Sequence, residues 1–192
     1  MTRYLGLAEF FWLAEQVTGL HTTTLVKASR VDLADSALHA PQAGYGDEDF
    51  YPDLYDKAAV RTCRFTENHP LPDGNKRAAW ACLLLFVDLN DGCWDPDPPD
   101  VEEAVHAMLD VAAHKIDEES FAGWLRQVAA PMTTARRRFF RRGAARCLAP
   151  RHVAGHIRRL RRTVADLLDR WLGQASSAWS STTLTQTRID YW

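Results

Sequence analysis

The sequence lacks any stretch that suits a membrane-spanning helix. Such a helix needs about 18 to 20 apolar residues, and the longest apolar run, Ala78–Val87, falls well short of that. Glu9 and Glu15 interrupt the apolar stretch near the N-terminus, so no secretory signal is predicted. We therefore expect a cytoplasmic protein that makes no use of a membrane.

Cysteine is scarce, and its spacing suits neither a metal nor a disulfide framework. The four cysteines are Cys63, Cys82, Cys93 and Cys147, which form no CxxC pair and no zinc-like grouping. We interpret them as free thiols in a reducing compartment. This pattern excludes a zinc-binding module and a small domain held together by disulfides.

Basic residues are scarce in the first two thirds of the chain. Residues 1–130 carry 10 Lys or Arg against 22 Asp or Glu, whereas residues 131–192 carry 13 Arg against 3 Asp and have no Lys. Contacts with nucleic-acid phosphates need a basic face, so the acidic part is not expected to bind nucleic acid directly. The division predicts a domain over 1–130 and an Arg-rich C-terminal extension over 131–192.

The extension admits three interpretations. Its clusters Arg136–Arg142 and Arg158–Arg162 could bind nucleic acid or an acidic partner. It could also fold back onto the acidic domain, or be an irregular addition without a function, which we favour slightly. Apolar residues at helical spacing predict one amphipathic helix over about 152–173 and otherwise irregular chain.

Strand-like alternation is rare, and most apolar positions recur at helical spacing. The sequence therefore predicts an all-α bundle of about six helices with a basic C-terminal extension. Asp32 and Asp117 are expected to cap helices, and Pro41–Asp53, rich in Gly, Asp, Tyr and Pro, is expected to lack regular structure. The expected helices are Leu7–Val17, Leu33–His39, Leu54–Asn68, Gly74–Leu89, Val101–His114 and Asp117–Val128.

The stretch His69–Arg77 combines residue types that handle phosphate. The proline after His69 biases it away from helical geometry, so one helix should stop there and a buried helix should begin at Gly74. The first turn of a helix exposes unpaired N–H groups and a partial positive charge, which suit a phosphate. Lys76 and Arg77 lie where the helix dipole disfavours cations by about 0.3–1 kcal/mol each. A bound anion would remove that conflict.

Each of these residues also has an ordinary structural interpretation. Lys76 and Arg77 could be solvated surface charges, and a lone histidine before a proline is more often structural than catalytic. However, a histidine, a carboxylate, an amide and two cations within nine positions are the groups that phosphoryl transfer requires. The combination at a loop-to-helix junction therefore favours phosphoryl-transfer chemistry.

The same nine residues resemble the signature of the Fic/Doc family. The match is to its Doc branch in particular, whose motif ends in Asp-x-Asn-Lys-Arg as Asp73–Arg77 does. Members that transfer adenylyl groups carry a glycine where this chain has Lys76, and a further arginine where it has Trp80. Leu71 replaces the usual phenylalanine, and Pro72 stiffens the loop. The flanking segments that agree with the family, within a resemblance covering about 4–129, are Ser36–Leu38 with Pro41, Phe50–Leu54, Lys57–Ala59 and Leu85–Asn90.

The resemblance implies the Fic/Doc-like helical fold and a site for ATP and Mg²⁺. His69 would be the general base toward a Thr or Ser hydroxyl, since its reference pKa of about 6.5 leaves it mostly neutral at pH 7. Asp73 would hold Mg²⁺. The phosphates would be bound by Gly74, which permits a tight entry into the helix, and by Asn75, Lys76 and Arg77.

The resemblance also implies a flap that aligns the target peptide by strand-like pairing. Pro41–Asp53 occupies that position in the sequence. Tyr45, Gly46, Phe50 and Tyr51 are therefore candidate target-positioning residues, although an ordinary connecting loop is an equal alternative.

The partners follow from the resemblance as well. It implies a toxin kinase that phosphorylates elongation factor Tu, blocks translation and is neutralised by a Phd-like antitoxin whose disordered end folds on binding. Protein adenylyl transfer is one alternative, which Lys76 and Trp80 disfavour. A catalytically silent module acting through antitoxin and operator DNA is another, which the intact His69 and Asp73 disfavour.

Overall fold

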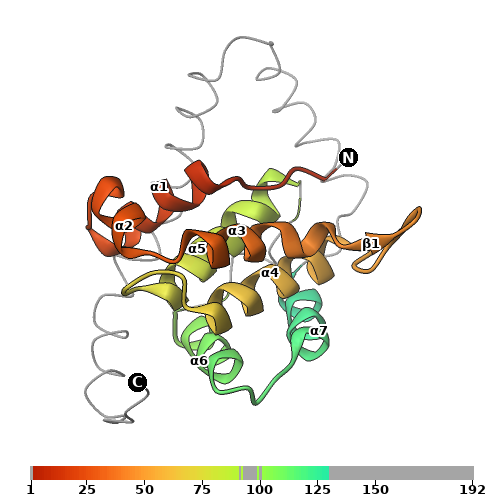
Figure 1. The fold of residues 1–192 in the computed structure, drawn as a ribbon. Coiled ribbons are helices and arrows are strands. Elements are labelled where there is room, and N and C mark those ends of the chain that lie inside the picture. The colour runs from red at the N-terminus through yellow and green to blue at the C-terminus, as the bar shows by residue number, and fades with distance from the viewer. Residues whose placement is uncertain (1, 91, 93–98, 100, 130–192) are drawn as a thin grey trace, which may run out of the picture.

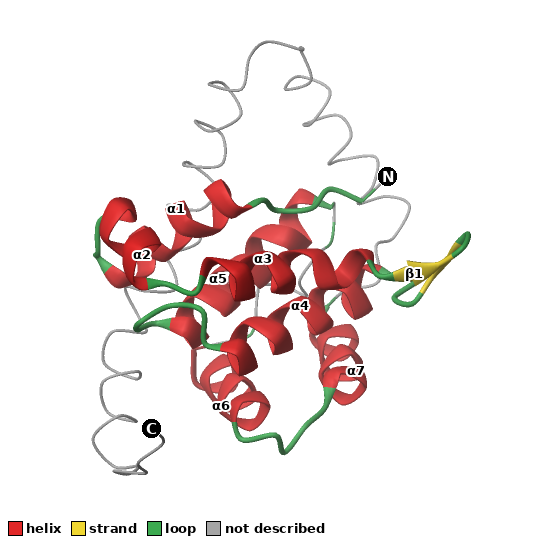
Figure 2. Cartoon of the chain, viewed as in Figure 1, coloured by secondary structure: helices red, strands yellow, loops and turns green. Residues whose placement is uncertain are grey.

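The computed structural model describes residues 2–90, 92, 99 and 101–129, and within them it confirms the all-α prediction. These residues form seven α-helices, one short 3₁₀ helix and one small antiparallel hairpin (Figures 1 and 2). None of the described helices is long and apolar enough to cross a membrane. The Arg-rich extension and its predicted amphipathic helix lie outside the described residues. The helices are α1 (Leu7–Thr18), α2 (Thr22–Ala28), α3 (Val31–His39), α4 (Leu54–Asn68), α5 (Asn75–Leu89), α6 (Val101–Ala112) and α7 (Glu118–Val128).

Helices α4 and α5 form the centre of the molecule. Every residue of Ala78–Val87 in α5 is buried, as its apolar sequence predicts. Helix α5 packs against α1, α4 and α6, whereas α4 packs against α3, α5, α6 and α7. The rings of Phe10 in α1 and Phe65 in α4 stack with centroids 4.5 Å apart, so the first helix is fixed to the central pair by aromatic contact.

Two helices begin at aspartate caps. Asp53 accepts hydrogen bonds from the backbone N–H groups of Tyr55 (2.7 Å) and Asp56 (2.9 Å) at the start of α4. Asp117, the predicted cap, accepts from the N–H of Ser120 at 2.8 Å at the start of α7. Each carboxylate satisfies donors that have no partner inside the helix and lies at the positive end of its dipole.

The structure differs from the sequence prediction around α2 and α3. Helix α2 was not expected, because three threonines open it and β-branched residues have low helix propensity; the His21 side chain caps it by accepting from the N–H of Thr23 at 3.3 Å. Helix α3 begins at Val31, with Arg30 in the capping position. Asp32 therefore lies in the first turn of α3 and is not its cap.

The segment after α3 is more regular than expected. A 3₁₀ turn, Ala40–Gln42, leads into strands β1 (Gly44–Tyr45) and β2 (Glu48–Asp49), which pair antiparallel and project from the helical body (Figure 2). Buried Lys57 in α4 anchors this hairpin, since its Nζ donates to the Asp49 carboxylate (2.7 Å) and to the Tyr51 carbonyl (2.6 Å). The hairpin is thus fixed to the first turn of α4.

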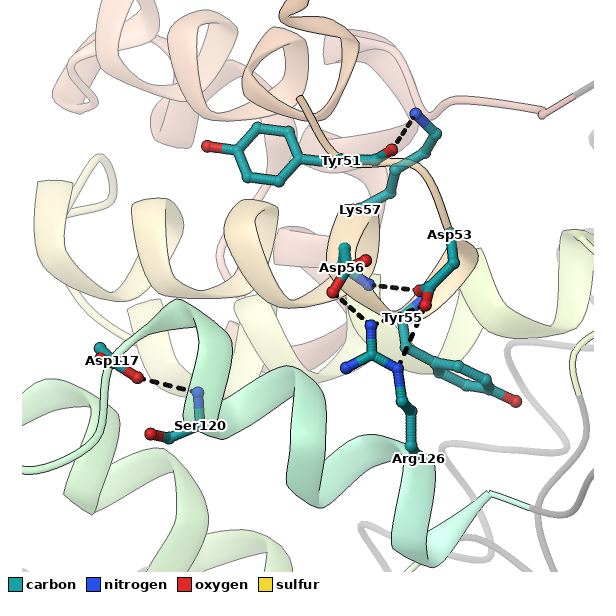
Figure 3. A network of polar contacts seen from close by, with 8 residues as sticks. All are labelled: Tyr51, Asp53, Tyr55, Asp56, Lys57, Asp117, Ser120 and Arg126. Atoms are coloured by element: carbon teal, nitrogen blue, oxygen red, sulfur yellow. Dashed lines mark hydrogen bonds and ion pairs between the residues drawn. The ribbon is translucent and has the colours of Figure 1, made fainter. Parts of the chain in front are cut away.

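A second clamp joins α7 to the start of α4. The Arg126 guanidinium donates through Nε (3.1 Å) and Nη2 (2.6 Å) to the Asp53 carboxylate and also pairs with Asp56 (Figure 3). The planar guanidinium is suited to such a two-donor contact. Because α7 is the last described helix, this clamp closes the bundle.

The core contains one charged side chain that its surroundings do not balance. Arg61 of α4 is only 1% exposed. Its Nη2 donates to the Cys82 carbonyl at 2.9 Å, and its guanidinium carbon lies 4.1 Å from the centroid of the Phe86 ring. Among the described residues, Nε and Nη1 of Arg61 have no acceptor. Burial lowers the pKa of Arg61 to about 10.

The two cysteines in the described part of the chain are free thiols, as predicted. Cys63 and Cys82 are buried in α4 and α5 and form no disulfide. Burial raises the pKa of both thiols to about 12. Neither is therefore a nucleophile at neutral pH, because the thiolate is the reactive form.

Candidate functional site

The loop between α4 and α5 begins at a histidine in an unusual backbone conformation. Helix α4 ends at Asn68, as the following residues predicted, and His69 adopts φ 45°, ψ 57°. For a residue with a side chain this left-handed region costs about 1–2 kcal/mol. Residues held in such conformations against that cost are often functional, so the strain supports a role for His69 beyond ending the helix.

Two side chains hold the loop in shape. The Asn75 amide bonds both backbone groups of Leu71, accepting from its N–H and donating to its carbonyl, each at 2.8 Å. On the other side, Nη2 of Arg30 donates to the carbonyls of Asn68 (2.5 Å) and His69 (2.8 Å). Asn75 was predicted to bind phosphate; its side chain shapes the loop in this structure, and its backbone N–H, in the first turn of α5, is the group that remains for an anion.

Helix α5 begins with open amide groups. Gly74 occupies the capping position at φ 76°, and no side chain among the described residues caps the first turn. The first intrahelical bond is made by Ala78, whose N–H donates to the Gly74 carbonyl at 2.8 Å. The N–H groups of Asn75, Lys76 and Arg77 therefore lack helical acceptors, which makes this turn suitable for an anion.

Gly74 cannot be replaced without strain. Its φ is in the region that favours glycine, and a Cβ built on it would lie 2.7 Å from Cγ2 of Thr18. We expect Gly74→Ala to lower the free energy of unfolding by about 1–3 kcal/mol, measured by urea denaturation. Adding Thr18→Ser should recover the steric part of that loss only, because it removes Cγ2 but keeps the hydroxyl that donates to Ala14.

The matched control is Gly123→Ala in α7. A Cβ at Gly123 meets nothing within 4 Å, so this change should be neutral or stabilise by up to about 1 kcal/mol. Equal unfolding free energies for the Gly74→Ala and Gly123→Ala variants would contradict the strain at Gly74.

Asp73 and Arg77 contact each other, and Arg77 also contacts the end of α1. Nη1 of Arg77 donates to the carbonyl of Val17, at the end of α1, at 3.1 Å. Its Nη2 lies 3.4 Å from Oδ2 of Asp73, whose Oδ1 accepts from the N–H of Gly74 at 2.6 Å. The Asp73 side chain is still 78% exposed, so its remaining lone pairs face solvent.

Lys76 is the cation of the loop that has no ion pair among the described residues. It acts on His69 electrostatically: partial burial lowers the pKa of the His69 imidazole, and the charges of Lys76 and Arg30 lower it further. The imidazole is therefore neutral at pH 7 and available to accept a proton. The ring is not buried in packing, since His69 keeps part of its surface exposed.

The structure brings together most of the predicted site but not the predicted flap. His69, Asp73 and Gly74 to Arg77 lie in one loop and the first turn of α5. Tyr45, Gly46, Phe50 and Tyr51 precede α4, whereas His69 follows it, and the 15 residues of α4 span roughly 22 Å at 1.5 Å per residue. The role of Pro41–Asp53 as a target-aligning flap stays a prediction: the hairpin is exposed, with Tyr45 84% accessible, and it projects near the N-terminal end of α4.

The segment that does border the loop was not singled out from the sequence. Val17 and Thr18 at the end of α1 meet Arg77 and Gly74, and Arg30 meets the end of α4. The sequence could have indicated a special role for Arg30, because a basic residue is a poor helix cap and the helix dipole disfavours it at an N-terminus. No feature of the sequence pattern predicts the contacts of Val17 and Thr18.

Comparison with known proteins agrees with this geometry. The Fic/DOC family profile matches residues 4–87, and the chain belongs to the Fic/DOC family, whose members are transferases. A curated relative, Toxin Doc of Mycolicibacterium smegmatis (strain ATCC 700084 / mc(2)155), is 38% identical over 109 residues. That alignment spans 57% of this chain and 83% of the relative. The resemblance to the Doc branch is thereby confirmed.

Proposed function

We propose that this chain is a Doc-type toxin that transfers the γ-phosphate of ATP to a Thr or Ser hydroxyl of a protein. The observation that carries the proposal is the uncapped first turn of α5 with Lys76 in it, whose charge is near enough to His69 to lower the pKa of its imidazole. Three N–H groups and an ammonium suit a polyphosphate, and a charge contact of about 4 Å is worth a few kcal/mol at an effective dielectric of about 20.

The transfer needs one base and one positioned phosphate. The His69 imidazole accepts the proton of the target hydroxyl, and the hydroxyl oxygen forms a bond to the γ-phosphorus. The bond from that phosphorus to the oxygen bridging to the β-phosphate breaks, and ADP leaves with the bonding pair. A base of this kind contributes about 10²–10⁴ in rate, and in-line positioning supplies much of the remainder.

The residues present fit a Mg²⁺ ion held jointly with ATP. No group of three or more His, Cys, Asp or Glu side chains in the described residues could form a metal cage, but Mg²⁺ is commonly bound by one or two carboxylates with phosphate oxygens and water. Asp73 is exposed beside the open turn of α5 and would hold the ion there. When bound, Mg²⁺ would neutralise charge on the phosphates.

Support for a toxin comes from the relative, which is named Toxin Doc. By the same resemblance, the target is elongation factor Tu, and a Phd-like antitoxin neutralises the activity in the cytoplasm. The acidic character of residues 1–130 disfavours direct operator binding by this part of the chain. A growth assay with and without a co-expressed Phd-like antitoxin tests this partnership.

The reaction is tested by the position of the label in ATP. Purified protein is incubated with elongation factor Tu and ATP labelled in the γ-phosphate or, separately, in the α-phosphate. We expect label in the target from the γ position only. Label from the α position would support adenylyl transfer, and label from neither, in elongation factor Tu or in a cell extract, would support a catalytically silent module.

The pKa of His69 predicts the acid limb of the activity. Because burial, Lys76 and Arg30 lower it below the usual 6.5, more than half of the His69 imidazole is neutral at pH 6.5. The midpoint of the acid limb of the activity should therefore lie below that value. Single-turnover transfer measured from about pH 5 to 8 checks this, and an acid limb with its midpoint above pH 6.5 would contradict it.

A further inference from the structure

Arg30 is held against the catalytic loop by both its backbone and its side chain. Its N–H donates to the Pro70 carbonyl at 2.9 Å, and Nη2 donates to the carbonyls of Asn68 and His69 at 2.5 and 2.8 Å. These contacts link the N-terminus of α3 to the C-terminus of α4 across 38 or more positions in the sequence.

The two carbonyls need a partner for a physical reason. The last carbonyls of a helix accept no hydrogen bond within the helix. A helix that ends in a left-handed residue usually has glycine there, which completes the turn without strain. In this chain that position is His69, with φ 45°. A charged donor shared by the carbonyls of Asn68 and His69, which belong to the two peptide groups that flank the His69 Cα, stabilises this end in place of glycine.

We propose that Arg30 is a positioning residue for His69, fixing the left-handed backbone at 69 and so directing the imidazole toward the first turn of α5. The guanidinium does not need to touch the substrate to do so. The inference rests on the proposed function for its effect on catalysis, but its geometric part concerns the histidine itself.

A second consequence concerns charge. The cation of Arg30, in the capping position of α3, and that of Lys76, in α5, both lower the pKa of His69, after the larger effect of partial burial. Arg30 would thus keep the imidazole unprotonated while it fixes the imidazole's direction. Removal of the Arg30 side chain should therefore raise the pKa of His69 and also change the direction of its imidazole.

The test compares Arg30→Met, which removes the donors and the charge, with Arg30→Lys, which retains one charged nitrogen. A single nitrogen of Arg30 reaches both carbonyls, so a lysine ammonium can replace it in part. The backbone bond from residue 30 to Pro70 is kept in both variants. Lys27, exposed in the last turn of α2 and without a hydrogen bond or ion pair to any described residue, gives the matched control Lys27→Met.

The first measurement is independent of ATP. The ring resonances of His69 are titrated by NMR in each variant, and we expect the His69 pKa to rise in Arg30→Met, to rise less in Arg30→Lys and to stay unchanged in Lys27→Met. If Arg30→Met melts below the assay temperature, Arg30→Gln, which keeps a donor without the charge, is expected to shift the pKa in the same direction.

The second measurement is transfer from γ-labelled ATP. A misplaced base should lower kcat by roughly 10- to 100-fold in Arg30→Met, with little change in KM for ATP, and Arg30→Lys should recover most of it. A titration and a kcat in Arg30→Met that both match the wild type would overturn the proposal. If the wild type transfers no phosphate, the proposed function fails while the NMR titration still decides the role of Arg30.

Discussion

Replacing His69 with alanine is expected to reduce phosphate transfer by about 10²–10⁴-fold. The substitution removes the group that we propose as the acceptor of the hydroxyl proton and leaves Lys76 and the open turn of α5 in place. Binding of ATP should therefore change little, so the loss should fall on kcat and not on KM. Rapid-quench measurement of transfer from γ-labelled ATP separates the two.

The chain offers a matched control for this change. His114, after α6, is the other described residue with a side chain and a positive φ, at 52°; its side chain is 72% exposed, and its Nδ1 lies 3.7 Å from the Glu67 carboxylate. His114→Ala therefore tests the loss of a left-handed histidine without changing a residue of His69–Arg77, and its transfer rate should stay within about twofold of the wild type. Equal losses in His69→Ala and His114→Ala would point to backbone strain in place of base catalysis.

Replacing Arg61 with methionine is expected to stabilise the protein by about 1–4 kcal/mol. Arg61 is fully buried, two of its nitrogens lack acceptors among the described residues, and burial lowers its pKa to about 10. Desolvating a charge without a balancing anion is costly, and methionine fills similar space with no polar atoms. The melting temperature should rise by about 2–4 °C for each kcal/mol.

The control is Arg64→Met, one turn along α4. Arg64 is 46% exposed at its side chain and pairs with Glu118 at 3.0 Å. Exposed pairs contribute about 0–1 kcal/mol, so this change should lower stability slightly. A drop of more than about 1 kcal/mol in Arg61→Met, measured by calorimetry, would mean that the cation–π contact with Phe86 and the bond to Cys82 outweigh desolvation.

The central helices could be predicted because one signal dominates each of them. The unbroken apolar stretch Ala78–Val87 could only be a buried helix in a chain with so few strand-like segments, and Asp117 gave a clear cap for α7. The residues after Asn68 marked the end of α4. In these places local propensity and tertiary packing agree, which is the condition under which a sequence pattern is informative.

The site could be predicted as a list of residues but not as an arrangement. The sequence could single out the nine residues from His69 as a candidate site because they are contiguous. The arrangement around them depends on Val17, Thr18 and Arg30, which come from other helices and carry no periodic signal. Asn75 illustrates why a list of residues does not predict an arrangement, because a side-chain amide in such a motif can bind a phosphate or form hydrogen bonds within its own loop.

The separation between the hairpin and the loop at His69 has a physical explanation. Pro41–Asp53 directly precedes α4, whereas His69 directly follows it, so both flank the same element in the sequence. A helix of 15 residues holds its two ends apart, and sequence order alone does not show that. The missed α2 has a different cause, since the cap at His21 and packing of buried Leu25 outweigh the low propensity of its threonines.

The loop at 69–74 is held from three directions, by the end of α1, the start of α3 and the first turn of α5. No fragment shorter than the span from Val17 to Arg77 contains all of these supports. A nascent or proteolytically nicked chain that has lost one of them should therefore lack activity even where its remaining helices form. When limited proteolysis is followed over time, protease resistance and phosphate transfer should be lost together. Toxicity would then require the complete fold.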